Sequence, residues 1–180
     1  TRVNRFFGTT WTAENCRYPV RKTQENGDDR TRPANIIITC TDNTRSRLEL
    51  WRFLKKYREA SVNNERAVYY WMDFGNAQTT GQVVIGTVRN KIRQPTSKEF
   101  MPVPGMNVIT EEVNYSTIEE KDSGPSCSLT EALERQDLYI NSILAQVGCD
   151  ILWRMFKEGR TLYRGAYINL DTLRVNPIPI

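Results

Sequence analysis

The 180-residue chain contains no histidine, and this absence excludes several kinds of catalysis at once. A Ser-His-Asp or Cys-His arrangement uses imidazole as its base, so neither can be built within this chain. Metal sites that depend on imidazole ligands are excluded for the same reason. Any chemistry here must therefore use carboxylates, thiols, hydroxyls or cationic side chains.

Cysteines are few and are not grouped. Cys16, Cys40, Cys127 and Cys149 lie far apart, and no two of them form a CxxC motif. This spacing indicates neither a zinc site nor a disulfide framework. Cys40 ends an apolar run and Cys149 lies in an apolar periodic segment, so we predict that both thiols are buried.

Long apolar runs are also missing. No stretch approaches the roughly 20 residues that cross a bilayer, and the first residues, TRVNRFFGTTW, lack the apolar centre of a signal peptide. We therefore expect a cytoplasmic protein with no membrane partner. The net charge is +4, but the 25 basic and 21 acidic residues are interspersed rather than clustered. Nucleic acid is therefore not an expected partner, whereas a small anionic ligand suits this charge.

The chain does contain the pattern of one α/β domain. Its length suits a single domain, and 39% hydrophobic with 26% charged residues is typical of a globular protein. Apolar periodicity predicts strands at 11–17, 35–41, 67–74, 82–88 and 167–170, and helices at 2–7, 44–60 and 128–158. Polar loops are expected at 21–32 and, with four prolines, at about 89–127.

Three consecutive isoleucines mark residues 35–41 as a strand buried on both faces of a parallel sheet. The helix that follows has an apolar stripe, and the next strand completes a strand-helix-strand unit, which indicates a parallel crossover. We therefore predict a mostly parallel sheet with flanking helices. Ser128 and Glu131 have the spacing of a capping box that would begin the last helix. The predicted core includes the aromatic and aliphatic side chains of Leu48, Trp51, Leu54, Tyr57, Trp71, Leu133, Ile140, Leu144, Val147, Ile151, Trp153 and Met155.

The residues after the isoleucine strand, in IIITCTDNTRSR, carry the main functional hypothesis. In an open parallel sheet, ligands bind beyond the carboxyl ends of the strands, and Asp42 occupies such an end. The alternative is that Asp42 or Asn43 caps the following helix, and the pattern alone favours the cap. Arg45 or Arg47 could face a phosphate from the first helical turn, although arginines on helices are usually solvated.

A second polar group follows the next apolar strand. Asp73, Gly75 and Asn76 are typical of a turn, and that is the preferred interpretation. The alternative places them near Asp42, in a channel for a peptide tail.

Several blocks of this sequence resemble one family. IIITCTDNTRSR and YYWMDFGNAQTTGQVVIGT resemble the second half of the ThiF/MoeB superfamily, the fold that also activates ubiquitin. VNRFFGTTW, PSCSLTEALERQDLYINS and LWRMFKEG with NLDTLRVNPIPI resemble more closely the ThiF family of the bacterial PRTRC cassette. In the superfamily, a strand ending in T-D-N precedes a helix, and the next strand leads to a G-Q-V strand. The resemblance covers nearly the whole chain.

The resemblance implies ATP-dependent adenylation of a C-terminal carboxylate, usually that of a small ubiquitin-like or sulfur-carrier protein. It implies that Asp42 binds Mg²⁺ and assists the magnesium–ATP complex, and we expect Asn43 and Arg45 to contact the cofactor beside it. Cys127 resembles a family cysteine that forms a thioester or persulfide, and a neighbouring helix N-terminus would favour its thiolate. The alternative is an inert loop cysteine. Because members of the family commonly form dimers, the resemblance also implies a possible homodimer.

The chain departs from the family in one respect. No G-x-G-x-x-G turn for nucleotide phosphates occurs in these residues. We therefore expect residues 1–180 to be the C-terminal portion of a single ThiF-like adenylating domain, with an incomplete Rossmann-like fold and no activity by itself. The alternative is a catalytically idle ThiF-like scaffold that keeps the fold for partner binding.

Overall fold

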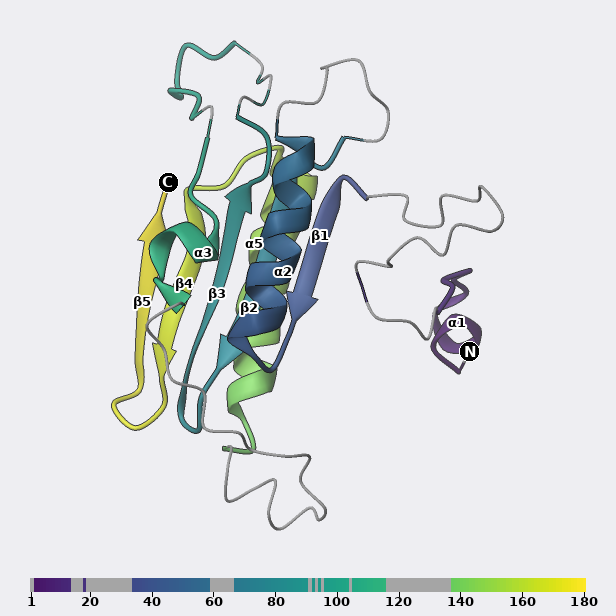
Figure 1. Cartoon of the computed structure of the whole chain (residues 1–180), viewed down its shortest axis with the longest axis vertical. Helices are drawn as coiled ribbons and strands as arrows, with labels where there is room; N and C mark the ends of the chain where they lie inside the picture. Colours follow the sequence, from purple (N-terminus) through teal and green to yellow (C-terminus); the bar gives the residue numbers. More distant parts are fainter. Residues whose placement is uncertain are drawn as a thin grey trace. The chain divides into compact units, whose positions relative to one another are not determined.

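The computed structural model describes residues 2–13, 18, 34–58, 67–90, 92, 94, 96–103, 105–115 and 137–180. The chain divides into two compact units, Thr1–Arg32 and Pro33–Ile180. The first unit contains the short helix α1 (Arg2–Phe7), which confirms the predicted helix at this position. The second unit contains a five-stranded sheet with helices packed against it (Figure 1).

The sheet has the strand order β1-β2-β3-β4-β5. Its strands are β1 (Ile36–Cys40), β2 (Tyr70–Asn76), β3 (Thr80–Thr87), β4 (Tyr163–Asn169) and β5 (Arg174–Pro179). The helices of this unit are α2 (Thr44–Leu54), which continues into the 3-10 turn η1 (Lys55–Tyr57), then α3 (Ile109–Glu112) and α5 (Ile140–Glu158). Within the described residues, no helix combines the length and apolar character that crossing a bilayer requires.

The prediction of a mostly parallel sheet is wrong. β1 and β2 are parallel, as predicted for the strand-helix-strand unit, but β3 is antiparallel to β2, β4 to β3, and β5 to β4. Only residues 77–79 separate β2 from β3, whereas a parallel connection needs about a dozen or more residues. The chain is therefore α/β with a mixed, mostly antiparallel sheet, and this topology does not support the Rossmann-like description.

The isoleucine strand lies at the edge of the sheet, which corrects its predicted burial. Among the described residues, β1 pairs with β2 alone, and α5 packs over β2, β3 and β4. Ile38 is 51% exposed as a result. An apolar run shows that a segment favours a strand, but it does not show how many neighbours cover that strand.

The core forms on both faces of the sheet, with α2 on one face and α5 on the other (Figure 1). The α2 face contains the stacked rings of Trp51 and Trp71, as predicted. On the α5 face, the predicted residues Ile140, Leu144 and Ile151 are buried. Trp153 was also predicted in the core, but it is 60% exposed because it lies on the side of α5 away from the sheet.

Several predicted boundaries need correction. α5 begins at Ile140 rather than at residue 128, since Asp137 accepts a hydrogen bond from the backbone of Tyr139 in a turn that precedes the helix. The proposed capping box, Leu133 and the polar loop at 21–32 lie outside the described residues. Residues 11–13 are not a strand, whereas the closing NPIPI lies largely in β5 and pairs with β4.

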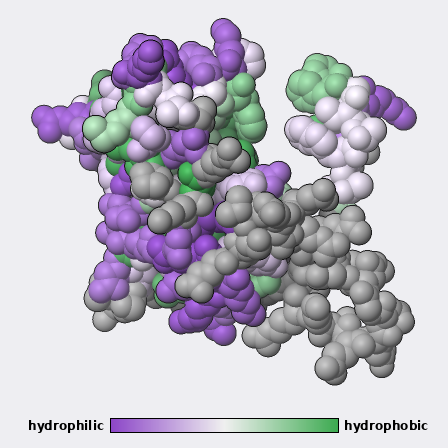
Figure 2. Space-filling model, turned by 90° about the horizontal axis from the view of Figure 1, so that it is seen from above, coloured by the Kyte–Doolittle hydropathy of each residue, from purple (hydrophilic) through white to green (hydrophobic). Residues whose placement is uncertain are grey.

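Within the predicted long loop at 89–127, described residues pack against the sheet. Its residues 109–112 form α3, and the backbones of Thr87 and Met106 are hydrogen-bonded. Outside the core, the coloured surface in Figure 2 is mostly hydrophilic, with apolar side chains visible between the polar ones.

We predict that Gly86→Ala destabilises the protein because β3 lies directly against the segment before α3. A Cβ at residue 86 would lie 2.5 Å from the carbonyl oxygen of Asn107 and from the Cα of Val108, and backbone atoms cannot move aside locally. The expected loss is about 1–3 kcal/mol in the free energy of unfolding measured with urea. Gly105→Ala is the control, since its nearest neighbour would be 3.6 Å away. Equal losses in the two variants would contradict this packing.

Candidate functional site

The turn between β1 and α2 is shaped by Asn43. This residue has an extended backbone, with φ −138° and ψ 153°, and its side-chain oxygen accepts a hydrogen bond from the backbone N–H of Ser46 at 2.8 Å. This is the geometry of a helix N-cap. The cap interpretation is therefore confirmed for Asn43, and Asp42 is not needed for it.

Asp42 is the second residue after the carboxyl end of β1 and is exposed. It makes no hydrogen bond or ion pair with another residue in the described part of the chain. The amino end of α2 begins two residues later, and such an end favours negative charge nearby, including phosphate. The carboxylate of Asp42 is thus available to a ligand at the end of the strand.

Arg45 is the exposed cation of this turn. Its side chain is 80% exposed and pairs with Glu49 at 3.2 Å, one helical turn further along α2. Surface pairs at this spacing contribute only about 0.3–0.5 kcal/mol. The guanidinium can therefore exchange Glu49 for a phosphate with little loss of stability.

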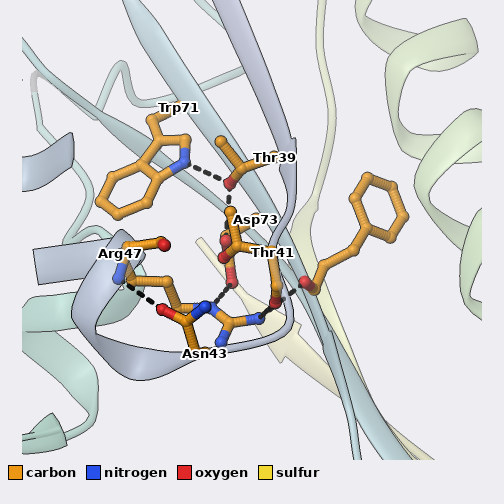
Figure 3. Close-up of polar contacts among 8 residues, drawn as sticks. Thr39, Thr41, Asn43, Arg47, Trp71 and Asp73 are labelled. Carbon is orange, nitrogen blue, oxygen red and sulfur yellow. Dashed lines mark hydrogen bonds and ion pairs between the residues drawn. The ribbon is translucent and has the colours of Figure 1, made fainter. Parts of the chain in front are cut away.

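Arg47, in contrast, is buried, which corrects the prediction that it is solvated. It is only 6% exposed. Its guanidinium donates to Asp73 Oδ2 at 2.9 Å and to the carbonyl oxygens of Thr41 at 2.7 Å and Phe74 at 3.0 Å (Figure 3). One side chain of α2 thereby joins the end of β1 to β2.

Asp73 is the buried anion that matches Arg47, so its interpretation as a turn residue is wrong. It lies within β2, fully buried, opposite Thr39 of β1. Its Oδ1 accepts a hydrogen bond from the hydroxyl of Thr39 at 2.6 Å, and that hydroxyl accepts one from the indole N–H of Trp71 at 2.8 Å. A continuous set of polar contacts therefore leads from the core to the turn (Figure 3).

Two opposing effects act on the pKa of Asp73 in this buried pair. Burial raises the pKa of Asp73 above its ordinary value, while the charge of Arg47 and the hydrogen bonds from Thr39 and Arg47 act to lower it. Loss of hydration is the largest of these effects, as is usual for a buried ion pair. The pair therefore adds little net stability, but it requires a specific arrangement of the two side chains.

Gly75 and Asn76 belong to β2 rather than to a turn. A side chain at residue 75 would collide with the amide of Gln82 and with the guanidinium of Arg47. Glycine at residue 75 therefore leaves room for the side chains of Gln82 and Arg47, which both approach its Cα. The turn itself follows at residues 77–79, where the backbone N–H of Ala77 donates to Thr80.

The exposure of the cysteines differs from the prediction. Cys127 lies outside the described residues. Cys40 and Cys149 were predicted to be buried, but both are exposed and unpaired. Partial burial of the thiol and then the nearby Asp73 carboxylate raise the pKa of Cys40, which disfavours its thiolate.

Arg47 was missed as a site residue although the sequence contains the signal for it. Arg47, Leu50, Trp51 and Leu54 have the spacing i, i+3, i+4, i+7, and all four are buried on one face of α2. An arginine in that register, followed by an aspartate inside an apolar strand, indicates a buried ion pair.

No family model and no curated protein matches this chain.

We predict that Arg47→Met raises the pKa of Asp73 further, because it removes the charge that opposes the effect of burial. The pKa is measured by following the carboxyl ¹³C shift of Asp73 with pH. Arg45→Met is the matched control, since Arg45 is exposed and pairs with Glu49. An equal shift in both variants, or an Asp73 pKa below its ordinary value in the wild type, would contradict this assignment.

The raised pKa also sets a pH dependence. The contribution of Asp73 to stability is fully present below the pKa of the unfolded chain, about 3.9. It is lost as the pH rises through the higher pKa of the folded state.

Proposed function

We propose that this protein is part of a ThiF-type adenylyltransferase, in which Asp42 binds the magnesium ion of Mg–ATP. The substrate class is the C-terminal carboxylate of a small ubiquitin-like or sulfur-carrier protein. The observation that carries the proposal is the exposed carboxylate of Asp42 at the carboxyl end of β1, next to the amino end of α2.

The order of the elements supports the proposal. β1 is followed by Thr41-Asp42-Asn43, α2, β2 and then β3, which contains Gly81, Gln82 and Val83. This is the order that the resemblance implies: a strand ending in T-D-N, a helix, a strand and a G-Q-V strand. The antiparallel β2–β3 connection places the G-Q-V segment opposite the carboxyl end of β2. Asp42 and this segment therefore belong to the same end of the sheet.

The open edge of β1 is consistent with a larger nucleotide-binding sheet. In the part of the chain that the structure describes, β1 pairs on one side only, and its Ile38 is half exposed. Exposed apolar edges readily accept another strand. Since the 180 residues contain no G-x-G-x-x-G turn, the proposal assigns the phosphate-binding turn to a segment outside them that would add at this edge.

The donor set at the turn fits Mg²⁺ in the company of a nucleotide. In the described residues, no three acidic or cysteine side chains gather to hold a metal ion. Mg²⁺ is usually bound through one or two carboxylates together with substrate phosphates and water, so a single aspartate is sufficient from this part of the protein. When bound, the ion neutralises charge on the phosphates as pyrophosphate leaves.

In the proposed reaction, a carboxylate oxygen of the carrier tail attacks the α-phosphorus of ATP. The bond between that phosphorus and the pyrophosphate oxygen breaks, which gives an acyl adenylate and pyrophosphate. Asp42 holds the metal ion, and Arg45 exchanges its weak pairing with Glu49 for a phosphate. The predicted role of Cys127 is the next step, in which its thiolate attacks the acyl carbon and AMP leaves.

We predict that Asp42→Ala weakens Mg–ATP binding by the full-length natural protein at least about tenfold, since it removes a charged ligand of the metal ion. The dissociation constant is measured by isothermal titration calorimetry, with and without Mg²⁺. Asp150→Ala is the matched control, because Asp150 is an exposed aspartate of α5 that pairs with Arg154 one turn along the same helix.

Equal affinity in the wild type and Asp42→Ala would remove Asp42 from the site. No Mg–ATP binding by the full-length wild type would favour the idle scaffold instead.

A further inference from the structure

We infer that the buried pair of Arg47 and Asp73 is a positioning device for Asp42, an inference that rests on the proposed function. Neither residue is a candidate to touch the nucleotide, since both are buried. Their effect on a ligand must therefore pass through the turn that carries Asp42.

The contact with Thr41 connects the pair to Asp42. Arg47 donates to the carbonyl oxygen of Thr41 at 2.7 Å. That carbonyl belongs to the peptide group whose nitrogen is the backbone nitrogen of Asp42, and a peptide group is planar. The hydrogen bond therefore fixes the orientation of the peptide plane between Thr41 and Asp42.

The residue after Asp42 is fixed as well. The side chain of Asn43 accepts the N–H of Ser46 and closes the cap of α2. Asp42 thus stands between two anchored neighbours, which fixes the direction of its Cα–Cβ bond and so limits the region that its carboxylate can reach. A carboxylate held in one direction binds a metal ion with less loss of conformational entropy than a mobile one.

The shape of the guanidinium explains why the anchor is an arginine. Its Nε donates to Asp73, while its NH2 group donates to both Thr41 and Phe74 (Figure 3). These acceptors lie in two segments, the turn after β1 and the strand β2, and a planar fork can reach both at once. A lysine ammonium is a point charge on a flexible stem and cannot reproduce that arrangement.

The remaining contacts keep the fork in place. Asp73 is held by Thr39, and Thr39 by Trp71, which is stacked on Trp51 in the core. Hydrogen bonds in such a buried chain reinforce one another. The backbone at Asp42 is consequently linked to the buried, stacked tryptophans of the α2 face.

The test compares Arg47→Lys with Arg45→Lys in the full-length protein, together with Ile85→Ala as a control that destabilises the core from the α5 face. Two properties are measured: the hydrogen-exchange rate of the Ser46 amide, which reports on the cap of the turn, and the dissociation constant of Mg–ATP. Thr39→Val is a second variant, because it removes the hydroxyl that donates to Asp73 and accepts from Trp71 but leaves the ion pair intact.

Arg47→Lys is expected to speed exchange at Ser46 about tenfold more than Ile85→Ala does, and to weaken Mg–ATP binding about tenfold. Thr39→Val is expected to change both properties in the same direction, by about threefold. In a background that already carries Asp42→Ala, Arg47→Lys should not weaken Mg–ATP binding further. Arg45→Lys should leave the exchange rate unchanged.

Two results would overturn the inference: exchange at Ser46 that follows the core control, or losses of affinity that add fully in the double variant. If the wild type binds no Mg–ATP, the proposed function fails, and the exchange rate at Ser46 alone then decides whether Arg47 positions the turn.

Discussion

The rest of the structure at the carboxyl end of β1 and β2 depends on the ion pair between Arg47 and Asp73. The two groups are 2.9 Å apart and almost completely buried. A buried pair of this kind contributes little net stability, but losing one partner leaves an uncompensated charge and costs about 3–5 kcal/mol. The pair therefore restricts the chain to arrangements in which α2, the end of β1 and the middle of β2 meet at this point.

That restriction connects packing to function. The backbone of a strand-helix turn determines which side chain points outward. Here, hydrogen bonds of the Arg47 and Asn43 side chains hold the backbone on both sides of Asp42. Asp42 itself is left exposed, beside a helix end that favours anions. At this turn, the ion pair that joins α2 to the strands is buried, whereas Asp42 and the weakly paired Arg45 are exposed.

Local patterns in the sequence predicted local structure well. The spacing of apolar residues located α2 and the buried face of α5, and the strand-helix-strand unit gave the parallel pairing of β1 with β2. The directions of β3 and β5 follow from the short connections at residues 77–79 and 170–173, whereas the long connection at residues 88–162 does not determine the direction of β4. Residues 77–79 can form only a tight turn, and that constraint was available in the sequence.

The parts that could not be predicted depend on neighbours distant in sequence. The exposure of Ile38 and Cys40 reflects the edge position of β1, which the run of isoleucines does not reveal. Arg47 was predicted to be solvated because arginines on helices usually are. Its burial becomes clear once Asp73, 26 residues later, is recognised as its partner. The cap at Asn43, in contrast, involves only Ser46 three residues later, and Asn43 was one of the two predicted capping residues.

Anomalous diffraction from crystals of the full-length protein grown with Mn²⁺ and ATP tests the central claim most directly. The account predicts an anomalous peak about 2.1 Å from a carboxylate oxygen of Asp42, with the Arg47–Thr41 hydrogen bond intact beneath it. A nucleotide-bound Mn²⁺ peak on other protein ligands, with Asp42 directed away from it, would contradict the account.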